Sequence, residues 1–373
     1  MLRSANAFFL WFHRWSGIAF AAVFILVALS GTVLTFRYEL QQAMHPEMQV
    51  EPADVDGAPD FTAIAANLKS EIPGARLNFL QQNPAQPEFP IRVVYEHPLD
   101  GFDVLYADPH SARLIRSDVG EGFWRWMREL HIFLTAGMPG LFIVFASAWV
   151  LMLCSALGLW LWVPRLARKP QVALGIRWRS GTRKLLLDLH NTTGVYLLLP
   201  MMLLGLTGAT LILARLSPVD LPEPTAPAPA GFSAGTLGEP LEKALATLAA
   251  EAPAAFVRQI RLPSADLPSF RFDYDTADGA RIAFLSADGE KLLAVHAESS
   301  RSLWDQLKGE FGVAIHEGYV AGDFGRWIVF ICGITLTTGS VTGVWLWLVA
   351  RRRRRLRREP LPLPDTHHHQ PAE

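Results

Sequence analysis

The chain has 373 residues, of which 50% are hydrophobic and 18% are charged. This length allows two or three ordinary domains, and so small a share of charge means that the apolar residues must be clustered. The net charge of −1 hides an uneven distribution of Lys and Arg along the chain. A chain of evenly mixed soluble domains is therefore excluded.

Four windows contain no Asp, Glu, Lys or Arg: residues 15–36, 140–163, 191–214 and 327–350. At about 1.5 Å per residue, each is long enough to cross the roughly 30 Å hydrocarbon core of a bilayer. The first window follows a short basic start at Arg3, as a cleaved signal peptide does. It is longer than the apolar region of such a peptide and has a counterpart later in the chain, so we expect a retained helix.

The chain is expected to divide into eight segments. Transmembrane helices occupy 1–39 and 186–216, and two further ones, each after a shorter helix, occupy 123–164 and 303–350. Small α+β modules occupy 40–122 and, after a Pro/Ala-rich linker at 218–229, the rest of 217–302. The remaining two segments are a basic loop at 165–185 and a basic tail at 351–373.

Each module shows the same order of local patterns. The first is expected to have a helix at 61–71, then strands around Leu77, Val93 and Val104. The second is expected to have a helix at 239–251, then strands near Val257, Phe270 and Ile282. Turn residues follow at Asp108–Pro109 and Asp288–Gly289, which indicates two α+β units of similar design.

Lys and Arg indicate the orientation of the chain in the membrane. They gather between the second and third windows and after the fourth, where a run extends from Arg351 to Arg358. The positive-inside rule then places both termini in the cytoplasm and both modules outside. The Arg run could also form a nucleic-acid patch, but beside a spanning helix a topology signal is the better interpretation, and we expect no nucleic-acid partner.

The two halves of the chain share rare residues at fixed spacing. His13 and His190 each begin a motif whose second glycine, Gly31 or Gly208, follows eighteen residues later. A further set of matched pairs differs by 185 positions throughout: His131 and His316, Gly137 and Gly322, Gly140 and Gly325, Gly158 and Gly343, Trp160 and Trp345, Trp162 and Trp347. These coincidences indicate an internal duplication.

The H-R-W-S-G motif at His13, the L-H pair at His131 and the G-L-W-L-W sequence from Gly158 resemble the PepSY-associated transmembrane protein family. The resemblance covers nearly the whole chain. It is strongest to stand-alone inner-membrane members linked to siderophore iron, the FoxB type. The expected fold is a membrane α-helical bundle of four transmembrane helices with a two-fold internal repeat, carrying two periplasmic α+β PepSY-like modules.

Four histidines are the candidate cofactor ligands. In the expected topology His13 and His190 lie near the cytoplasmic face, whereas His131 and His316 lie near the outer face. Two imidazoles from facing helices are suitable axial ligands for a six-coordinate haem iron. Gly17, Gly31, Gly194 and Gly208 are expected to let the backbones approach the flat ring. We therefore expect two b-type haems with histidine as the metal ligand, since no C-x-x-C-H motif occurs.

Several alternatives remain open. Each histidine could be an interfacial or capping residue, and one haem rather than two could bind. Zinc or copper is disfavoured because no Cys, Asp or Glu accompanies the histidines at ligand spacing. Arg14, Arg128 and Arg326 could pair with haem propionates or be structural. The residues expected to have no part in a site are His45, His97, His110, His296 and His367–His369 at the surface, Cys154 and Cys332 in the core, and an aromatic belt of Trp124, Trp126, Trp160, Trp162, Trp345 and Trp347.

No nucleotide-binding or hydrolase motif occurs, and we expect no catalytic side chain. Two stacked haems would carry electrons outward from a cytoplasmic or quinol donor. The resemblance implies a ferric siderophore as acceptor, which makes the chain a ferric-siderophore reductase that releases Fe(II). The alternative is a PepSY-type membrane regulator or assembly factor without redox activity, which leaves the matched histidines unexplained.

Overall fold

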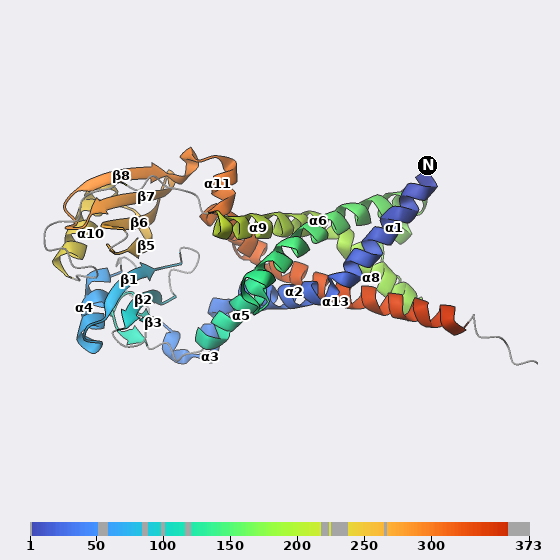
Figure 1. Ribbon diagram of the computed structural model, residues 1–373, viewed down its shortest axis with the longest axis horizontal. Coiled ribbons are helices and arrows are strands. Elements are labelled where there is room, and N and C mark those ends of the chain that lie inside the picture. Colours follow the sequence, from blue (N-terminus) through green and yellow to red (C-terminus); the bar gives the residue numbers. More distant parts are fainter. Residues whose placement is uncertain are drawn as a thin grey trace, which may run out of the picture.

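The computed structural model describes residues 2–50, 59–83, 89–97, 101–115, 121–217, 224, 238–264 and 267–356. Within these ranges the chain forms a bundle of long helices with a β-sheet domain at one end (Figure 1). The tail at 367–369 lies outside the described residues, as does the expected linker at 218–229 apart from residue 224.

Each half of the chain contributes one broken helix to the bundle. In the first half, α1 (Leu2–Ala19) and α2 (Ala21–Thr35) meet at Phe20 with a bend of 61°. In the second half, α8 (Thr182–Tyr196) and α9 (Leu198–Leu216) meet at Leu197, 177 positions further on. Pro200 accounts for the second break, because it has no N–H to offer the Tyr196 carbonyl. The first and third windows thus each contain a helix break, whereas the second and fourth lie within single helices.

Each half also contributes one long unbroken helix, α6 (Gly137–Arg168) and α13 (Gly322–Leu356). A shorter helix precedes each of them: α5 (Glu121–Phe133) in the first half, and α11 (Leu303–Lys308) with α12 (Glu310–Glu317) in the second. The chain turns sharply between the short and long helices through residues of positive φ, including Gly137 at 60° and Gly322 at 57°. Glycine adopts this backbone without strain.

Among the described residues, three helices are long and apolar enough to cross a membrane, or four if the bent pair α1–α2 is one span. The segments are 137–168, 198–216, 319–352 and the pair 5–19 with 21–35. The number and positions agree with the four uncharged windows of the sequence. α7 (Pro170–Leu174) lies in the loop between α6 and α8.

The long and broken helices pack across the two halves, α2 against α13 and α6 against α9. A Cβ atom at Gly333 of α13 would fall against Thr32 and only 3.2 Å from the Ala28 carbonyl oxygen. A Cβ atom at Gly205 of α9 would fall 2.9 Å from Met152 Cγ. Both helix pairs therefore approach closely because one residue at the crossing has no side chain.

The domain at the end of the bundle contains one eight-stranded antiparallel sheet of order β4-β3-β2-β1-β5-β6-β7-β8. The strands are β1 (Arg76–Gln81), β2 (Ile91–His97), β3 (Gly101–Ala107), β4 (Leu114–Ile115), β5 (Phe256–Arg261), β6 (Ser269–Thr276), β7 (Gly279–Ser286) and β8 (Leu292–Ala297). The two halves join where Leu80 of β1 pairs with Ile260 of β5. The sequence predicts six of these strands. It predicts neither β4 nor β8, and it does not predict the pairing of β1 with β5.

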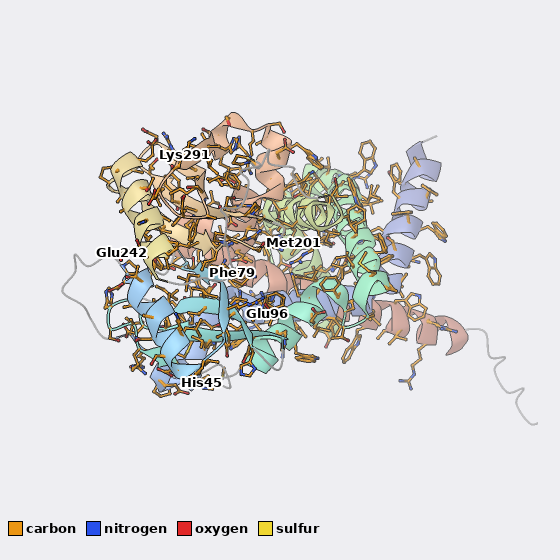
Figure 2. The ribbon with its side chains drawn as sticks, turned by 60° about the vertical axis from the view of Figure 1, so that its left-hand side comes forward. His45, Phe79, Glu96, Met201, Glu242 and Lys291 are labelled. Atoms are coloured by element: carbon orange, nitrogen blue, oxygen red, sulfur yellow. The ribbon has the colours of Figure 1, made fainter. Side chains whose placement is uncertain are left out.

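Two helices cover the sheet. α4 (Phe61–Glu71) and α10 (Glu239–Glu251) have the bounds that the sequence predicts, and Figure 2 labels Glu242 on α10 and Phe79 on β1. The fully buried Ile64, Leu68 and Leu241 belong to one apolar cluster that extends across both halves of the sheet. Burial of these side chains from water is the main stabilisation of the domain. The two α+β modules thus share a single core.

Short elements connect the sheet to the bundle: α3 (Arg37–Met44) and the 3₁₀ turns η1 (Pro46–Met48) and η2 (Glu298–Ser300). A third 3₁₀ turn, η3 (Tyr319–Ala321), lies between α12 and α13. Two of the expected belt tryptophans are core residues instead. Trp124 is fully buried, and Trp162 is buried with its indole N–H donating to the Ala173 carbonyl. Trp126, Trp160 and Trp345 are exposed, as residues of an aromatic belt are.

Candidate functional site

The four candidate histidines form two pairs at opposite ends of the bundle. His131 of α5 and His316 of α12 form the sheet-proximal pair, with ring centres 6.1 Å apart and planes inclined by 56°. His13 of α1 and His190 of α8 form the sheet-distal pair, with ring centres also 6.1 Å apart and planes inclined by 80°. The structure thus brings together the residues that the spacing argument pairs.

Backbone carbonyls and hydroxyls hold the sheet-proximal rings. His131 Nδ1 lies 2.9 Å from the Val27 carbonyl oxygen and 3.3 Å from Ser30 Oγ. His316 Nδ1 lies 2.9 Å from Thr207 Oγ1, with the backbone of Leu204 also close. The partners of the second ring lie 177 positions beyond those of the first.

These contacts settle which nitrogen carries the proton. A carbonyl oxygen can only accept, so His131 Nδ1 must donate to Val27. The Thr207 hydroxyl already donates to the Leu203 carbonyl at 2.8 Å, which leaves its oxygen to accept from His316 Nδ1. Both rings therefore carry a proton on Nδ1. In the neutral form of each ring the lone pair of Nε2 is then free to bind a metal, as in most histidine ligands.

The sheet-distal pair is held differently. His13 Nδ1 donates to the Cys154 carbonyl at 3.0 Å, which again leaves Nε2 with its lone pair. His190 Nδ1 is buried and has no hydrogen-bond partner among the described residues. The backbone of Gly339, 185 positions beyond Cys154, lies beside this ring and makes a weak, poorly aligned contact with it. One ring of this pair is held by a well-formed hydrogen bond and the other by this weaker backbone contact.

Glycines give the rings their space. A Cβ atom at Gly31 would lie 2.8 Å from His131 Cε1, and one at Gly208 would lie 3.2 Å from His316 Cε1. Gly31 and Gly208 therefore face the imidazole rings, whereas the sequence pattern predicts that they face the cofactor. Among the described residues, no atom outside the surrounding turns of the same helix lies within 4 Å of the Cβ positions of Gly17 and Gly194.

The spacing of each pair fits one metal ion between two imidazoles. With metal–nitrogen bonds of about 2 Å and roughly 1 Å from nitrogen to ring centre, opposed ligands have centres about 6 Å apart. Groups of three or more His, Cys, Asp or Glu that could hold a metal do not occur within the described ranges. The donor set is thus two imidazoles per site, which suits the iron of a haem and not tetrahedral zinc.

Charged side chains lie beside the sheet-proximal pair. Burial raises the pKa of Glu317 to about 7, an effect that Glu310 strengthens and Arg37, Arg128 and Arg326 oppose. The residue as a whole is exposed, so solvent still reaches this carboxyl although protein atoms are packed around it. Arg128 therefore contributes positive charge near the sheet-proximal pair. Such a charge is required of a side chain that binds a haem propionate.

Arg326 has a structural position instead. Its guanidinium is almost fully buried, pairs with Glu39 and Asp323, and donates to the Thr35 carbonyl at 3.0 Å. It also stacks 4.8 Å from the ring centre of Phe36. These contacts connect α13 to α2 and α3, so the propionate role considered for Arg326 is not favoured. Arg14, the third candidate, is exposed.

The residues expected outside the site have mixed positions. Cys154 and Cys332 are buried free thiols, as expected. His110 is exposed, whereas His296 lies edge-on to Phe284 and its Nε2 is buried with no hydrogen-bond partner among the described residues. His296 is thus only partly a surface residue, because β8 places it against β7.

The fold and the two histidine pairs define a multi-helix membrane protein with a sheet domain at one end. The chain belongs to the family described as the PepSY-associated TM region, whose model matches residues 10–350. A comparison with curated proteins found no match.

Proposed function

We propose that the chain is a haem-dependent electron-transfer protein of the bacterial inner membrane that reduces a ferric siderophore in the periplasm. The observation that carries the proposal is the presence of two histidine pairs, each with ring centres 6.1 Å apart, at opposite ends of one bundle. One pair could be explained as helix packing. Two pairs in two layers are the arrangement that transfer of charge across a membrane requires.

In this proposal His131 and His316 hold one haem b, and His13 and His190 hold a second. The bound group supplies reversible one-electron chemistry. The chain fixes His131 and His316 in the metal-binding tautomer through Val27 and Thr207. Apolar helices also surround each site. They exclude water and so favour the oxidation state in which the haem carries the lower net charge.

The orientation follows from charge. Basic residues gather in the loop between α6 and α8 and after α13, so we place both there in the cytoplasm, together with the N-terminus. The sheet domain then lies in the periplasm as two PepSY-like modules that arose with the helices by internal duplication. Reporter fusions after Arg116 and after Glu359 should report opposite sides of the membrane.

The acceptor is a ferric siderophore, whose hard oxygen ligands bind Fe(III) more strongly than Fe(II). One electron from the sheet-proximal site reduces Fe(III) to Fe(II), and the weaker grip on Fe(II) releases the metal. The electron enters at the sheet-distal site from a cytoplasmic protein or from quinol. The family membership and the position of the sheet domain above the sheet-proximal pair support this assignment.

The cofactor is tested by an absorption spectrum of protein purified from haem-replete cells. Low-spin b-type bands that sharpen on reduction are expected. His131→Ala and His316→Ala should remove the same spectral component, and the exposed His110→Ala should remove none. A colourless wild-type preparation would favour a membrane regulator or assembly factor without redox activity.

The reaction is tested with chemically reduced protein, a ferric hydroxamate siderophore and a colorimetric Fe(II) trap. Reoxidation of the haem and appearance of trapped Fe(II) should proceed together. The gallium form of the siderophore is the control, because Ga(III) cannot accept the electron. Equal reoxidation rates with the iron and gallium forms would reject the reductase assignment even if both haems are present.

A further inference from the structure

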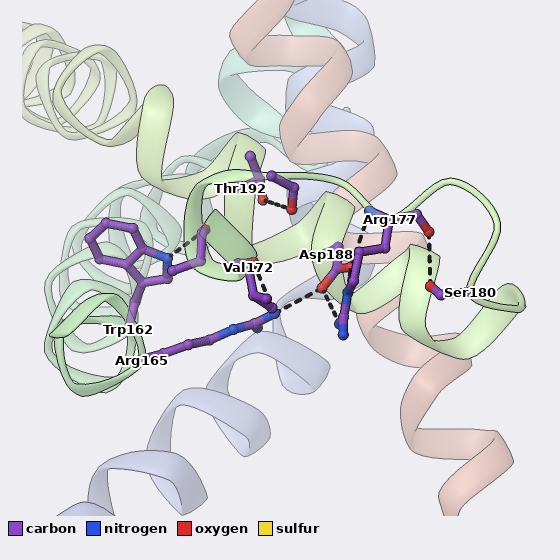
Figure 3. Close-up of polar contacts among 9 residues, drawn as sticks. Trp162, Arg165, Val172, Arg177, Ser180, Asp188 and Thr192 are labelled. Carbon is purple, nitrogen blue, oxygen red and sulfur yellow. Dashed lines mark hydrogen bonds and ion pairs between the residues drawn. The ribbon is translucent and has the colours of Figure 1, made fainter. Parts of the chain in front are cut away.

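The loop between α6 and α8 is fastened to both of these helices, and α8 carries His190 of the sheet-distal pair (Figure 3). The Trp162 indole donates to the Ala173 carbonyl at 3.1 Å, and Ser180 Oγ donates to the Arg177 carbonyl at 2.8 Å. At the other side of the loop, Thr192 Oγ1 lies 3.4 Å from the Gly175 carbonyl oxygen. The basic loop, which the sequence indicates only as a topology signal, thus has a defined structure.

Asp188 is the centre of this arrangement. Its carboxylate has no exposed surface, and two arginines from different elements hold it. Arg177 of the loop donates Nε to Oδ2 at 2.6 Å and Nη2 to Oδ1 at 2.8 Å, which is a bidentate pair. Arg165 of α6 donates to Oδ1 at 2.9 Å. The three residues, here called the Asp188 clamp, fix the start of α8 against the end of α6.

Among the described residues, the first half of the chain has no equivalent clamp. The position 177 residues before Asp188 is Trp11, whose side chain is 55% exposed. In that half His13 is held directly, by its bond to the Cys154 carbonyl. Within the described part of the chain His190 Nδ1 has only the weak contact with the Gly339 backbone, and His190 lies two residues after Asp188 on the same helix. The orientation of the His190 ring therefore depends more on the placement of α8 than that of His13 does on α1.

We propose that Asp188 is a positioning residue for His190, acting through its grip on Arg165 and Arg177. For His190, the clamp supplements a backbone contact that is weaker than the hydrogen bond that holds His13. The inference rests on the proposed haem function, because it assigns the clamp to the sheet-distal haem site. It predicts that loss of the clamp affects this site and not the sheet-proximal one.

Asp188→Asn and Arg177→Lys are the test variants. The amide loses the charge that holds both guanidinium groups, and the lysine keeps a charge but cannot form the bidentate pair. Loss of haem from the sheet-distal site to an excess of haem-free myoglobin should become roughly tenfold faster or more, as when partners of metal ligands are removed. The electron paramagnetic resonance signal of that site should shift, while the sheet-proximal signal remains. Arg179→Gln and Arg183→Gln change exposed arginines of the same region and should alter neither quantity.

A second readout does not depend on haem. Diethyl pyrocarbonate modifies neutral imidazoles, and mass spectrometry resolves the peptides that carry His13 and His190. In haem-free protein Asp188→Asn should raise the modification rate of His190 and leave that of His13 unchanged. Unchanged haem loss, resonance signal and His190 reactivity in a folded Asp188→Asn variant would overturn the positioning role. Wild-type protein that binds no haem would refute the proposed function, and with it the assignment of the clamp to a haem site.

Discussion

The two halves of this chain place the same helices in the same order but hold them by different bonds. The first half has Leu141, Ser30 and Asp60 where the second half has Arg326, Thr207 and Gly238. The backbone breaks at Phe20 and Leu197 are nevertheless equivalent in position. The comparison teaches that the helix geometry is common to both halves, whereas the bonds that support it are particular to each.

Arg326→Leu should have the largest effect on stability. The substitution introduces leucine, the residue found at the equivalent position of the first half, Leu141. Glu39, Asp323 and the Thr35 carbonyl would all lose their cationic partner. Removing one member of a buried, charge-assisted network costs about 3 kcal/mol. The melting temperature of the purified protein should fall clearly. Arg14→Leu, at an exposed position, should change it little, and equal melting of both variants would show that the network adds nothing.

Gly31→Ala should remove the sheet-proximal haem signal more completely than Gly208→Ala. The new methyl group would lie 2.8 Å from His131 Cε1 in the first variant and 3.2 Å from His316 Cε1 in the second. Such overpacking costs about 1–3 kcal/mol and displaces the ring. Gly17→Ala and Gly194→Ala introduce the same methyl group where no described atom outside the surrounding turns of the same helix lies within 4 Å. If these controls lose as much haem, the effect is one of helix stability and not of ring contact.

The helices on the sheet and the pairing of the histidines were both predictable from the sequence. α4 begins at Phe61 because Asp60 caps it, and its apolar residues recur at helical spacing. The pairing of His131 with His316 followed from matched spacing. The break at Phe20 could not be predicted, because Ala19 and Ala21 beside it are good helix formers. Neither could the Asp188 clamp, whose arginines resemble any basic loop until the fold brings them to one carboxylate.

Thr207→Val should change the sheet-proximal site more than Ser30→Ala does. Thr207 Oγ1 lies 2.9 Å from Nδ1 of His316. Ser30 Oγ lies 3.3 Å from Nδ1 of His131, which also donates to the Val27 carbonyl. A hydrogen bond of this kind contributes about 1 kcal/mol. Potentiometric titration followed by absorbance should show the larger shift in midpoint for Thr207→Val. Equal shifts would mean that the hydroxyl contacts do not distinguish the two ligands.

The smallest effect is expected at the start of α4. The Asp60 carboxylate accepts from the Ala63 amide at 2.8 Å, whereas Gly238 before α10 offers no side chain. The bond to Thr62 and that amide lower the pKa of Asp60 below its ordinary value. Its contribution to stability is therefore present above pH 4 and is lost as the pH falls through the lowered value.

Asp60→Ala should cost about 1 kcal/mol at neutral pH, seen as faster hydrogen exchange of the α4 amides. Asp60→Asn keeps an acceptor and should cost less, with no dependence on acid. Exchange in α10 should be unchanged in both variants. Faster exchange in both helices would indicate that the whole sheet domain opens as one unit.

The junction of β1 with β5 has a consequence for synthesis of the chain. β1 ends at Gln81, and the strand that covers its edge begins only at Phe256. At roughly 5–20 residues per second, a ribosome needs about 9–35 s to make the intervening chain. During that time the first module has an open strand edge, the kind of surface that pairs with foreign strands. Synthesis of this protein therefore includes an interval in which a chaperone, or rapid arrival of the second module, has to protect one unpaired strand.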